Sequence, residues 1–241
     1  MRSVLLASLL GLVGLGLVAC GGGGGGDDTA ADASNVPAMI TISGKATKRE
    51  GTSSSAAAGV VVAAYQSTDP NTPVAMATTD AMGNYSMVIT TNGKALDGFL
   101  KATLASFLDT YLYAPKPLDA DFSSASINMI NSSTLGLLSG TLCASAQDNA
   151  KGVIALIVAD ANNTAVAGAM TTSSPAAAKI CYNQGGFPNK TATMTDTDGI
   201  AYLLNVNAGK VTVNAAGAGA PYHSHDVDAR AGVFTTTVIQ P

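Results

Sequence analysis

TMTDTDGIAYLLNVNAGKVTVNAAG, residues 193–217, is the stretch that decides the fold of this chain. It places Asp196, Asp198 and Gly199 just ahead of two runs rich in β-favouring residues. By residue type, the two acids and the glycine fit both the start of a calcium loop and a tight turn between strands. A calcium loop collects about 6–8 oxygen ligands and commonly ends in a glutamate. Because Glu50, the chain's single glutamate, is far from this stretch, the sequence predicts a structural turn, with calcium as the alternative.

The same turn pattern occurs a second time, earlier in the chain. In TTDAMGNYSM, residues 78–87, Asp80 stands three positions before Gly83 and a tyrosine follows. Aspartate stabilises turns through its own carboxylate, and glycine takes backbone conformations that other residues avoid. This copy lacks the second acidic residue, so the two copies share turn chemistry rather than a set of metal ligands. We therefore predict that Asp80 and Gly83 form a turn like the later one.

The overall composition also favours strands and turns. The chain has 241 residues, enough for one large domain or two small ones. Apart from Glu50 its acidic residues are all aspartate, which prefers turns to helix interiors, and it contains 26 glycines. We predict an all-β protein.

Two units of similar order follow residue 37. Residues 38–121 and 150–241 each read as a buried strand, a turn, a strand, the Asp/Gly turn and a further strand. Between them, residues 122–149 carry leucines at helical spacing, so we predict a connector with a short helix. Residues 99–113 fit both a helix and strands, and their threonines and tyrosines favour strands.

These motifs resemble, in their order, the carboxypeptidase regulatory-like (transthyretin-like) β-sandwich family. The matching segments are GVVVAAY (59–65), ATTDAMGNYSM (77–87), TDTDGIAY (195–202) and NAGKVTVNA (207–215). The resemblance implies two tandem Ig-like, prealbumin-like Greek-key sandwiches. It also implies a non-catalytic protein that acts in binding or in a structural role.

The N-terminus reads as a secretion signal. MRSVLLASLLGLVGLGLVAC begins with one positive charge and continues with an apolar, glycine-containing stretch. Its last four residues resemble the bacterial lipobox, which implies cleavage after residue 19 and lipid on Cys20. Six glycines follow directly, so we expect residues 20–37 to be a lipidated cysteine and a flexible tether.

The lipobox resemblance also implies a location and a first partner. The N-terminal lipid would hold the protein at the membrane of a bacterial envelope. Gly21 rather than aspartate after the lipidated cysteine implies the outer membrane, with its face left open. Further partners are expected to be an envelope protein or a glycan, although only 5% of the residues are aromatic. Nucleic acid is not expected, because the net charge is −4 and no basic run exceeds Lys48-Arg49.

Two further cysteines, Cys143 and Cys181, form an even pair once Cys20 carries lipid. In an oxidising compartment the simplest interpretation is a disulfide between them. The alternative is two buried free thiols.

His223 and His225 are the one cluster that suggests chemistry. On a strand both imidazoles would point to one face and could share a metal. The order TDTDGIAY, NAGKV, PYHSHDV loosely resembles intradiol ring-cleavage dioxygenases, which implies ferric iron, but Lys210 follows the glycine turn where that family has a tyrosine nearby. We expect no cofactor and no enzyme activity. A metal-binding or metal-dependent module at these histidines is the alternative.

Overall fold

The computed structural model describes residues 36–219 and 221–241. The predicted signal peptide, the lipidated Cys20 and most of the tether lie outside the described residues. The described residues form one compact unit. Within the described part of the chain, no helix combines the length and the apolar character needed to cross a membrane.

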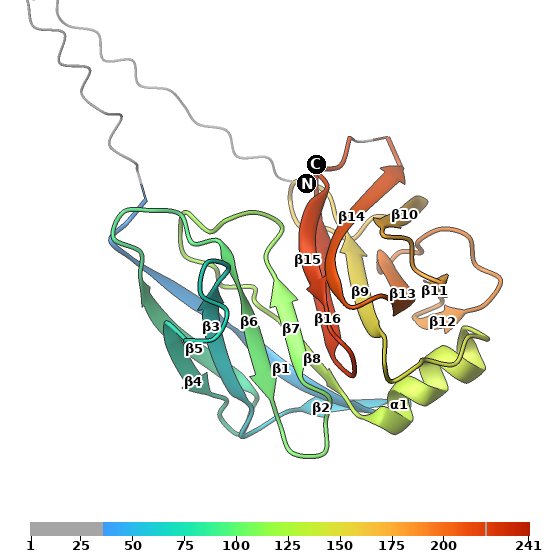
Figure 1. Ribbon diagram of the computed structural model, residues 1–241, viewed down its shortest axis with the longest axis horizontal. Coiled ribbons are helices and arrows are strands. Elements are labelled where there is room, and N and C mark those ends of the chain that lie inside the picture. Colours follow the sequence, from blue (N-terminus) through green and yellow to red (C-terminus); the bar gives the residue numbers. More distant parts are fainter. Residues whose placement is uncertain (1–35, 220) are drawn as a thin grey trace, which may run out of the picture. The chain divides into compact units, whose positions relative to one another are not determined.

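Strands are the main regular structure of the described chain, as Figure 1 shows, and the all-β prediction is confirmed. The strands are, in chain order, β1 (Met39–Glu50), β2 (Ser53–Ala56), β3 (Val61–Gln66), β4 (Ala75–Thr78), β5 (Asn84–Thr90), β6 (Gly98–Thr103), β7 (Thr110–Tyr113), β8 (Ile127–Ile130), β9 (Gly152–Val158), β10 (Ala169–Ser174), β11 (Lys179–Gln184), β12 (Phe187–Asn189), β13 (Ile200–Val206), β14 (Gly209–Gly217), β15 (His225–Ala229) and β16 (Phe234–Ile239). One helical segment, α1 (Ser132–Gly136), continues into a π-helical stretch, η1 (Leu137–Leu142).

Three sheets make up the fold. A long sheet has nine strands in the order β12-β11-β13-β9-β16-β7-β6-β3-β4. A second sheet has the order β2-β1-β5, with β8 also paired to β1, and a third has the order β10-β14-β15. Near the middle of the long sheet, β16 pairs in parallel with both β7 and β9. The long sheet therefore contains strands from both of the units predicted from the sequence.

The two smaller sheets cover opposite faces of the long sheet. Cross-strand pairing links Phe99, Tyr113, Thr237 and Leu156 in one row, so these side chains share a face. Phe99, Tyr113 and Leu156 join the core under the β10-β14-β15 sheet. Leu100, the next residue along β6, points the other way into the core under the β2-β1-β5 sheet. The result is layered sheet-on-sheet packing, as in β-sandwiches.

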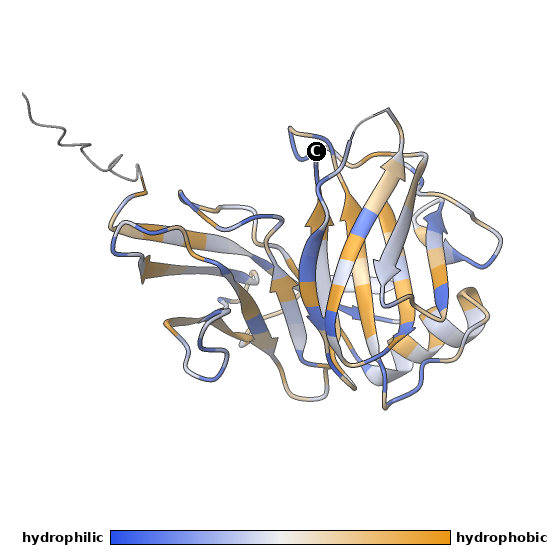
Figure 2. Ribbon diagram, turned by 45° about the horizontal axis from the view of Figure 1, so that its top comes forward, coloured by the Kyte–Doolittle hydropathy of each residue, from blue (hydrophilic) through white to orange (hydrophobic). Residues whose placement is uncertain are grey.

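Alternating burial explains why these residues form strands. Along β5 every second residue is buried, namely Tyr85, Met87 and Ile89. Along β14 Val211, Val213 and Ala215 do the same. A period of two is the side-chain repeat of a strand with one covered face. Figure 2 shows this alternation as orange and blue bands along the strands.

The stretch predicted as a connector contains the expected short helix and also a strand. Residues 132–142 are helical, and Asn131 caps their start by accepting a hydrogen bond from Thr134 N–H at 2.8 Å. Just before it, Ile127 and Met129 of β8 are buried, and β8 pairs with β1. Residues 99–113 contain β6 and β7 rather than a helix. The boundaries 38–121 and 150–241 stay a prediction.

The predicted disulfide between Cys143 and Cys181 is present. Cys143 follows η1, Cys181 lies on β11, and both are fully buried. The bond fastens the helical segment to the long sheet, on the face opposite the β10-β14-β15 sheet. The third core cluster lies there, and Leu135, Leu138 and Tyr202 belong to it.

Candidate binding site

Four aromatic side chains gather on one face of the long sheet. Tyr65 of β3, Phe99 of β6 and Tyr113 of β7 are direct cross-strand neighbours. Tyr111, two residues before Tyr113, points to the same face. The ring centroid of Phe99 lies 5.3 Å from the centroid of each of the other three rings. We call these four residues the aromatic row.

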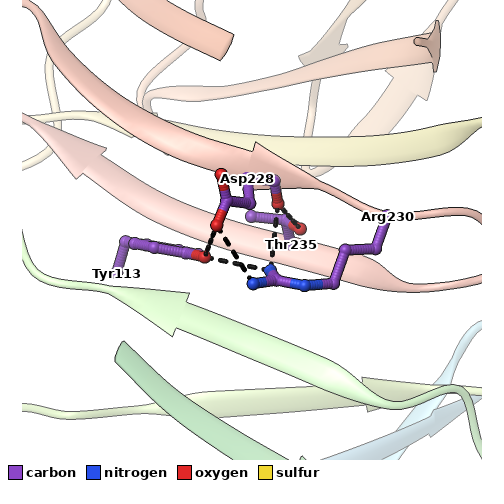
Figure 3. Close-up of polar contacts among 4 residues, drawn as sticks. All are labelled: Tyr113, Asp228, Arg230 and Thr235. Atoms are coloured by element: carbon purple, nitrogen blue, oxygen red, sulfur yellow. Dashed lines mark hydrogen bonds and ion pairs between the residues drawn. The ribbon is translucent and has the colours of Figure 1, made fainter. Parts of the chain in front are cut away.

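Arg230 lies across the aromatic row. Its guanidinium carbon is 4.2 Å from the ring centroid of Tyr111 and 5.1 Å from that of Phe99. Its Nη1 donates to the phenol oxygen of Tyr113 at 2.9 Å, and its Nη2 contacts Asp228 Oδ2 at 3.1 Å (Figure 3). A planar cation over aromatic faces is attracted by their π-electrons, so this side chain is held by stacking and by charge together.

Asp228 connects this cation to the third sheet. Its carboxylate accepts a hydrogen bond from the hydroxyl of Tyr113 at 3.4 Å. Its backbone carbonyl accepts from Thr235 Oγ1 at 3.1 Å and from Arg230 Nη1 at 3.3 Å (Figure 3). Asp228 belongs to β15, the outer strand of its sheet. The network therefore joins β15 and β16 to β7, across more than 100 residues of sequence.

Burial raises the pKa of the Tyr113 phenol, and the hydrogen bond from Arg230 opposes that rise. At neutral pH the phenol is therefore protonated, with one hydrogen to donate and a lone pair to accept. Its contacts with Arg230 and Asp228 use both capacities. The polar centre of the site is thus held in one arrangement.

A hollow of about 340 Å³ opens beside the aromatic row. One wall is β15, and the other consists of the loops that follow β3, precede β6 and follow β7. Pro70, Pro115 and Pro117 supply apolar surface from the loops, whereas Phe99 and Tyr113 line the hollow with only 6% and 7% of their surface exposed. The volume lies within the range of small-molecule sites, about 300–1,000 Å³.

Charges of both signs line the same hollow. They are the carboxylates of Asp97, Asp226 and Asp228 and the ammonium groups of Lys116 and Lys210. Asp226 accepts a hydrogen bond from Thr212 Oγ1 at 2.6 Å and contacts Lys210 Nζ at 3.3 Å. These two contacts, the Thr212 bond first, lower the pKa of Asp226. The carboxylate is thus ionised at neutral pH, and no single sign of charge dominates the hollow.

The two histidines occupy different environments. His225 faces the interior from β15, and its Nε2 lies 2.6 Å from Thr237 Oγ1. Its Nδ1 is buried without a hydrogen-bond partner, and burial lowers the pKa of the imidazole. His223 is exposed, ahead of the strand, with its backbone N–H donated to the carbonyl of Gln240. Among residues 36–219 and 221–241, no three His, Cys, Asp or Glu side chains group closely enough to hold a metal. The metal site stays a prediction.

At the first of the two turns, Asp80 binds the backbone that follows it. Its Oδ1 accepts from the N–H groups of Met82 and Asn84, both at 2.8 Å. These bonds lower the pKa of Asp80, the Asn84 N–H having the largest effect. The carboxylate acts as a turn cap.

At the second turn, the acids reach sideways to the β11–β12 hairpin. Asp196 Oδ2 accepts from the backbone N–H of Gly185 at 2.7 Å. Asp198 Oδ2 accepts from the side-chain amide of Asn183 at 2.6 Å. Both carboxylates therefore have protein donors.

The glycines of the two turns meet the same constraint. Gly83 has φ 81° and Gly199 has φ 67°. A Cβ added to Gly83 would lie 2.3 Å from the carbonyl oxygen of Ala46, and one added to Gly199 would lie 2.4 Å from that of Val158. In each case the glycine carbonyl accepts from the N–H of that same residue. The two turns are the same structural device used twice.

The sequence interpretation missed the main residues of this site. It did not predict Tyr113, Asp226, Asp228 or Arg230 as site residues. Once residues 99–113 are read as strands, the alternation of Phe99 and Lys101 with Leu100 already separates two faces. No local pattern, however, connects Arg230 with Tyr113, because their contact depends on the pairing of β16 with β7.

Among known proteins, this chain is similar to solved structures only, at low sequence identity. The sequence matches no protein-family model. It also matches no curated protein. Similar solved structures include the Bacillus anthracis TIE protein (13% identity, 83% of this chain and 34% of that chain covered, TM-score 0.26). The minor pilin GBS52 of Streptococcus agalactiae (11%, 83% and 94%, 0.28) and the shaft pilin SpaA of Lactobacillus rhamnosus GG (12%, 84% and 98%, 0.27) are others.

This chain spans about a third of the Bacillus anthracis protein. All three TM-scores are low.

Proposed function

We propose that this chain is a non-catalytic protein of the bacterial cell envelope that binds a partner at the hollow beside the aromatic row. The observation that carries the proposal is the hollow itself. It combines proline surface with five charged groups, beside the long sheet and at the edge of a second sheet. Sites of this kind, concave and partly apolar with a few placed polar groups, are typical of binding.

The state of the titratable groups supports binding rather than catalysis. Asp228 is engaged by Arg230, and Asp226 by Lys210 and Thr212. A general base needs a free lone pair within reach of a substrate proton. The imidazole of His225 instead has one nitrogen against Thr237 and the other buried. The carboxylates of Asp226 and Asp228 are therefore held in ion pairs and are not free to take a proton from a substrate.

The remaining parts of the proposal concern anchoring and organisation. Lipid on Cys20 holds the protein at the membrane, with residues 20–37 as the tether and the outer membrane as the destination. Residues 38–121 and 150–241 act as two sandwich modules, with 122–149 between them. One core takes its buried residues from 40–129, which supports a first module, whereas the other combines Phe99 and Tyr113 with residues 154–239 and so joins the two parts.

The anchoring is tested by labelling cells with radioactive palmitate and fractionating their membranes. The wild-type chain is expected to take up label and to sediment with membranes, and Cys20→Ala is expected to lose both. Gly21→Ala, one residue further on, is the matched control and should keep the label. Label on the Cys20→Ala chain would contradict the anchor.

The alternative, a metal-dependent module, is tested by elemental analysis of the purified full chain. The comparison is with a double variant, His223→Ala with His225→Ala. We expect no stoichiometric transition metal in either protein. A stoichiometric metal that the double variant loses would replace this proposal with a metalloprotein and reopen catalysis.

A further inference from the structure

We infer that β5 is a dimerisation edge, at which a second copy of this chain adds its own β5 in antiparallel pairing. β5 is the outer strand of the β2-β1-β5 sheet (Figure 1), and it pairs with β1 alone. The contact would join the two copies of that sheet into one continuous sheet. The inference goes beyond the proposed function, because neither the hollow nor Cys20 takes part in it.

Every second residue of β5 has backbone groups that point away from β1. The N–H of Ala46 donates to the carbonyl of Gly83 at 2.8 Å, which fixes the alternation of the ladder. The odd-numbered residues of β5 therefore bond β1, and Ser86, Val88 and Thr90 turn their N–H and C=O groups outward. Within residues 36–219 and 221–241, no partner bonds these outward groups.

The outer edge of β5 is also accessible. Val88 is 58% exposed, and Ser86 and Thr90 are exposed on either side of it. Ala75 and Ala77 of the neighbouring strand β4 pack on the core beneath β5, and β4 pairs with β3 instead of β5. β4 therefore leaves the hydrogen-bonding groups of this edge unoccupied.

The other outer strands are shorter, and the longer ones are already bonded at their edges. Of the outer strands that the structure describes, β5 is the longest, with seven residues. Along β10, the N–H of Thr171 donates to the hydroxyl of Tyr182, and the carbonyl of Ala169 accepts from the N–H of Thr195. On β15, the carbonyl of Asp228 is occupied as described above. Proteins also protect edges with charged residues or proline, and β5 contains neither.

The edge of β5 is complementary to itself. When two copies pair around Val88, this residue lies opposite Val88 of the second copy, and Ser86 lies opposite Thr90. Each outward residue then exchanges both backbone hydrogen bonds with the residue opposite. Valine meets valine and serine meets threonine, so the side chains match and no like charges come together. A two-fold dimer of this kind uses the same patch on both copies. The sequence of the edge thus favours a second copy as its partner.

The first test is the mass of the purified full chain, measured by sedimentation equilibrium in a density-matched detergent. We expect a dimer with a Kd below about 0.1 mM. Val88→Lys places a lysine opposite its own copy and is expected to weaken the dimer by at least about tenfold. Met170→Lys, a residue 52% exposed on the outer strand β10, is the matched control and should dimerise like wild type. Far-ultraviolet circular dichroism and the urea midpoint verify that both variants are folded.

The second test is disulfide cross-linking, which reports the register. Opposite residues that exchange both bonds have Cα atoms about 5.5 Å apart, within the usual disulfide range of about 4.4–6.8 Å. Val88→Cys should therefore cross-link to itself under mild oxidation. Ser86→Cys should not, because two copies of residue 86 would be about 14 Å apart, but it should cross-link when mixed with Thr90→Cys. Wild type is the control for Cys20, since Cys143 and Cys181 are already bonded to each other.

Three results would overturn the inference. The first is a monomer at about 0.1 mM, and this holds even if the monomer binds a valine-threonine hexapeptide, which would assign the edge to a different partner. The second is a dimer that Val88→Lys leaves unchanged, since another face would then form it. The third is cross-linking of Ser86→Cys alone as efficiently as with Thr90→Cys.

Discussion

Two threonines at the repeated turns are as closely matched as the glycines. Thr79 Oγ1 donates to the carbonyl of Ala57 at 2.6 Å and accepts from the N–H of Val60 at 2.9 Å. Thr195 Oγ1 makes the equivalent bonds to Val166 and Ala169, at 2.7 and 3.0 Å. Both threonines are buried. Each turn is therefore specified by a threonine that bonds two backbone groups, an aspartate whose carboxylate accepts backbone hydrogen bonds, and a glycine without room for a side chain.

The glycine requirement leads to a first prediction. Gly83→Ala places a Cβ 2.3 Å from the oxygen of Ala46 and also strains a positive φ. Gly51→Ala has a similar φ of 62° but meets nothing within 4 Å, so it is the matched control. We expect the control to lose about 1 kcal/mol in the free energy of unfolding and Gly83→Ala to lose roughly 2–3 kcal/mol more. Urea denaturation measures both, and equal losses would show that close approach does not matter there.

The buried imidazole of His225 leads to a second prediction, on pH. Because burial lowers its pKa, the unfolded chain takes up a proton at higher pH than the folded chain does. The free energy of unfolding should therefore fall as the pH drops below about 6.5, the unfolded value. His225→Gln should flatten this dependence between about pH 7 and pH 5. If urea midpoints of the variant and wild type fall in parallel across that range, another group is responsible.

For single residues, the sequence predicts a contact only where the interacting residues are close together in the chain. Asp80 and Gly83 are three positions apart, so their spacing alone predicts the turn that they form. The surroundings of Arg230 are set by β6 and β7, far away in sequence. For the same reason, the sequence could not show that its few aromatic residues include a row of four on one face.

At the scale of elements, the helical segment depends on one covalent bond. Five residues of α1 and six of η1 are too few to form a stable helix in isolation. Burial of Leu135 and Leu138 and the Cys143–Cys181 bond hold the segment against the long sheet. The leucine spacing was enough to predict the helix, whereas the π-helical continuation has no signal in the sequence.

Removal of this bond is the third prediction. The disulfide closes a loop with a sequence separation of 38, and the chain-entropy estimate for such a loop is about 3–4 kcal/mol. Cys143→Ala with Cys181→Ala should lower the free energy of unfolding by about that amount. Reductant should destabilise the wild type similarly and leave the double variant unaffected. A double variant as stable as the oxidised wild type would show that packing alone holds the segment.

At the scale of the whole molecule, the long sheet decides how the protein unfolds. β16 lies between β7 and β9, so hydrogen bonds run without interruption from strands near the start of the described chain to strands near its end. The sequence predicted strands on both sides of the connector but not this pairing, since strand patterns specify faces and not partners. The same alternation of buried and exposed residues along the strands fits both two separate sandwiches and one continuous sheet.

Shared strands make unfolding cooperative, which is the fourth prediction. Phe234→Ala removes a side chain that is 4% exposed at the start of β16, and it should cost about 3–5 kcal/mol. Native-state hydrogen exchange should then show lost protection in β3 as well as in β13. Met170→Ala, whose side chain is on a residue 52% exposed, is the control and should change little. Lost protection in β13 alone would mean that the two parts unfold as independent modules.

The position of β16 also determines when the long sheet can form during synthesis. Every other described strand precedes it in the chain, and yet it occupies the interior of the longest sheet. While the ribosome is still making this chain, β7 and β9 have nothing between them, and the hydrogen bonds that join the two parts cannot form. A nascent chain built in this way keeps the long sheet open until β16 has left the ribosome. Such a delay is compatible with the export that the proposed lipid anchor on Cys20 requires.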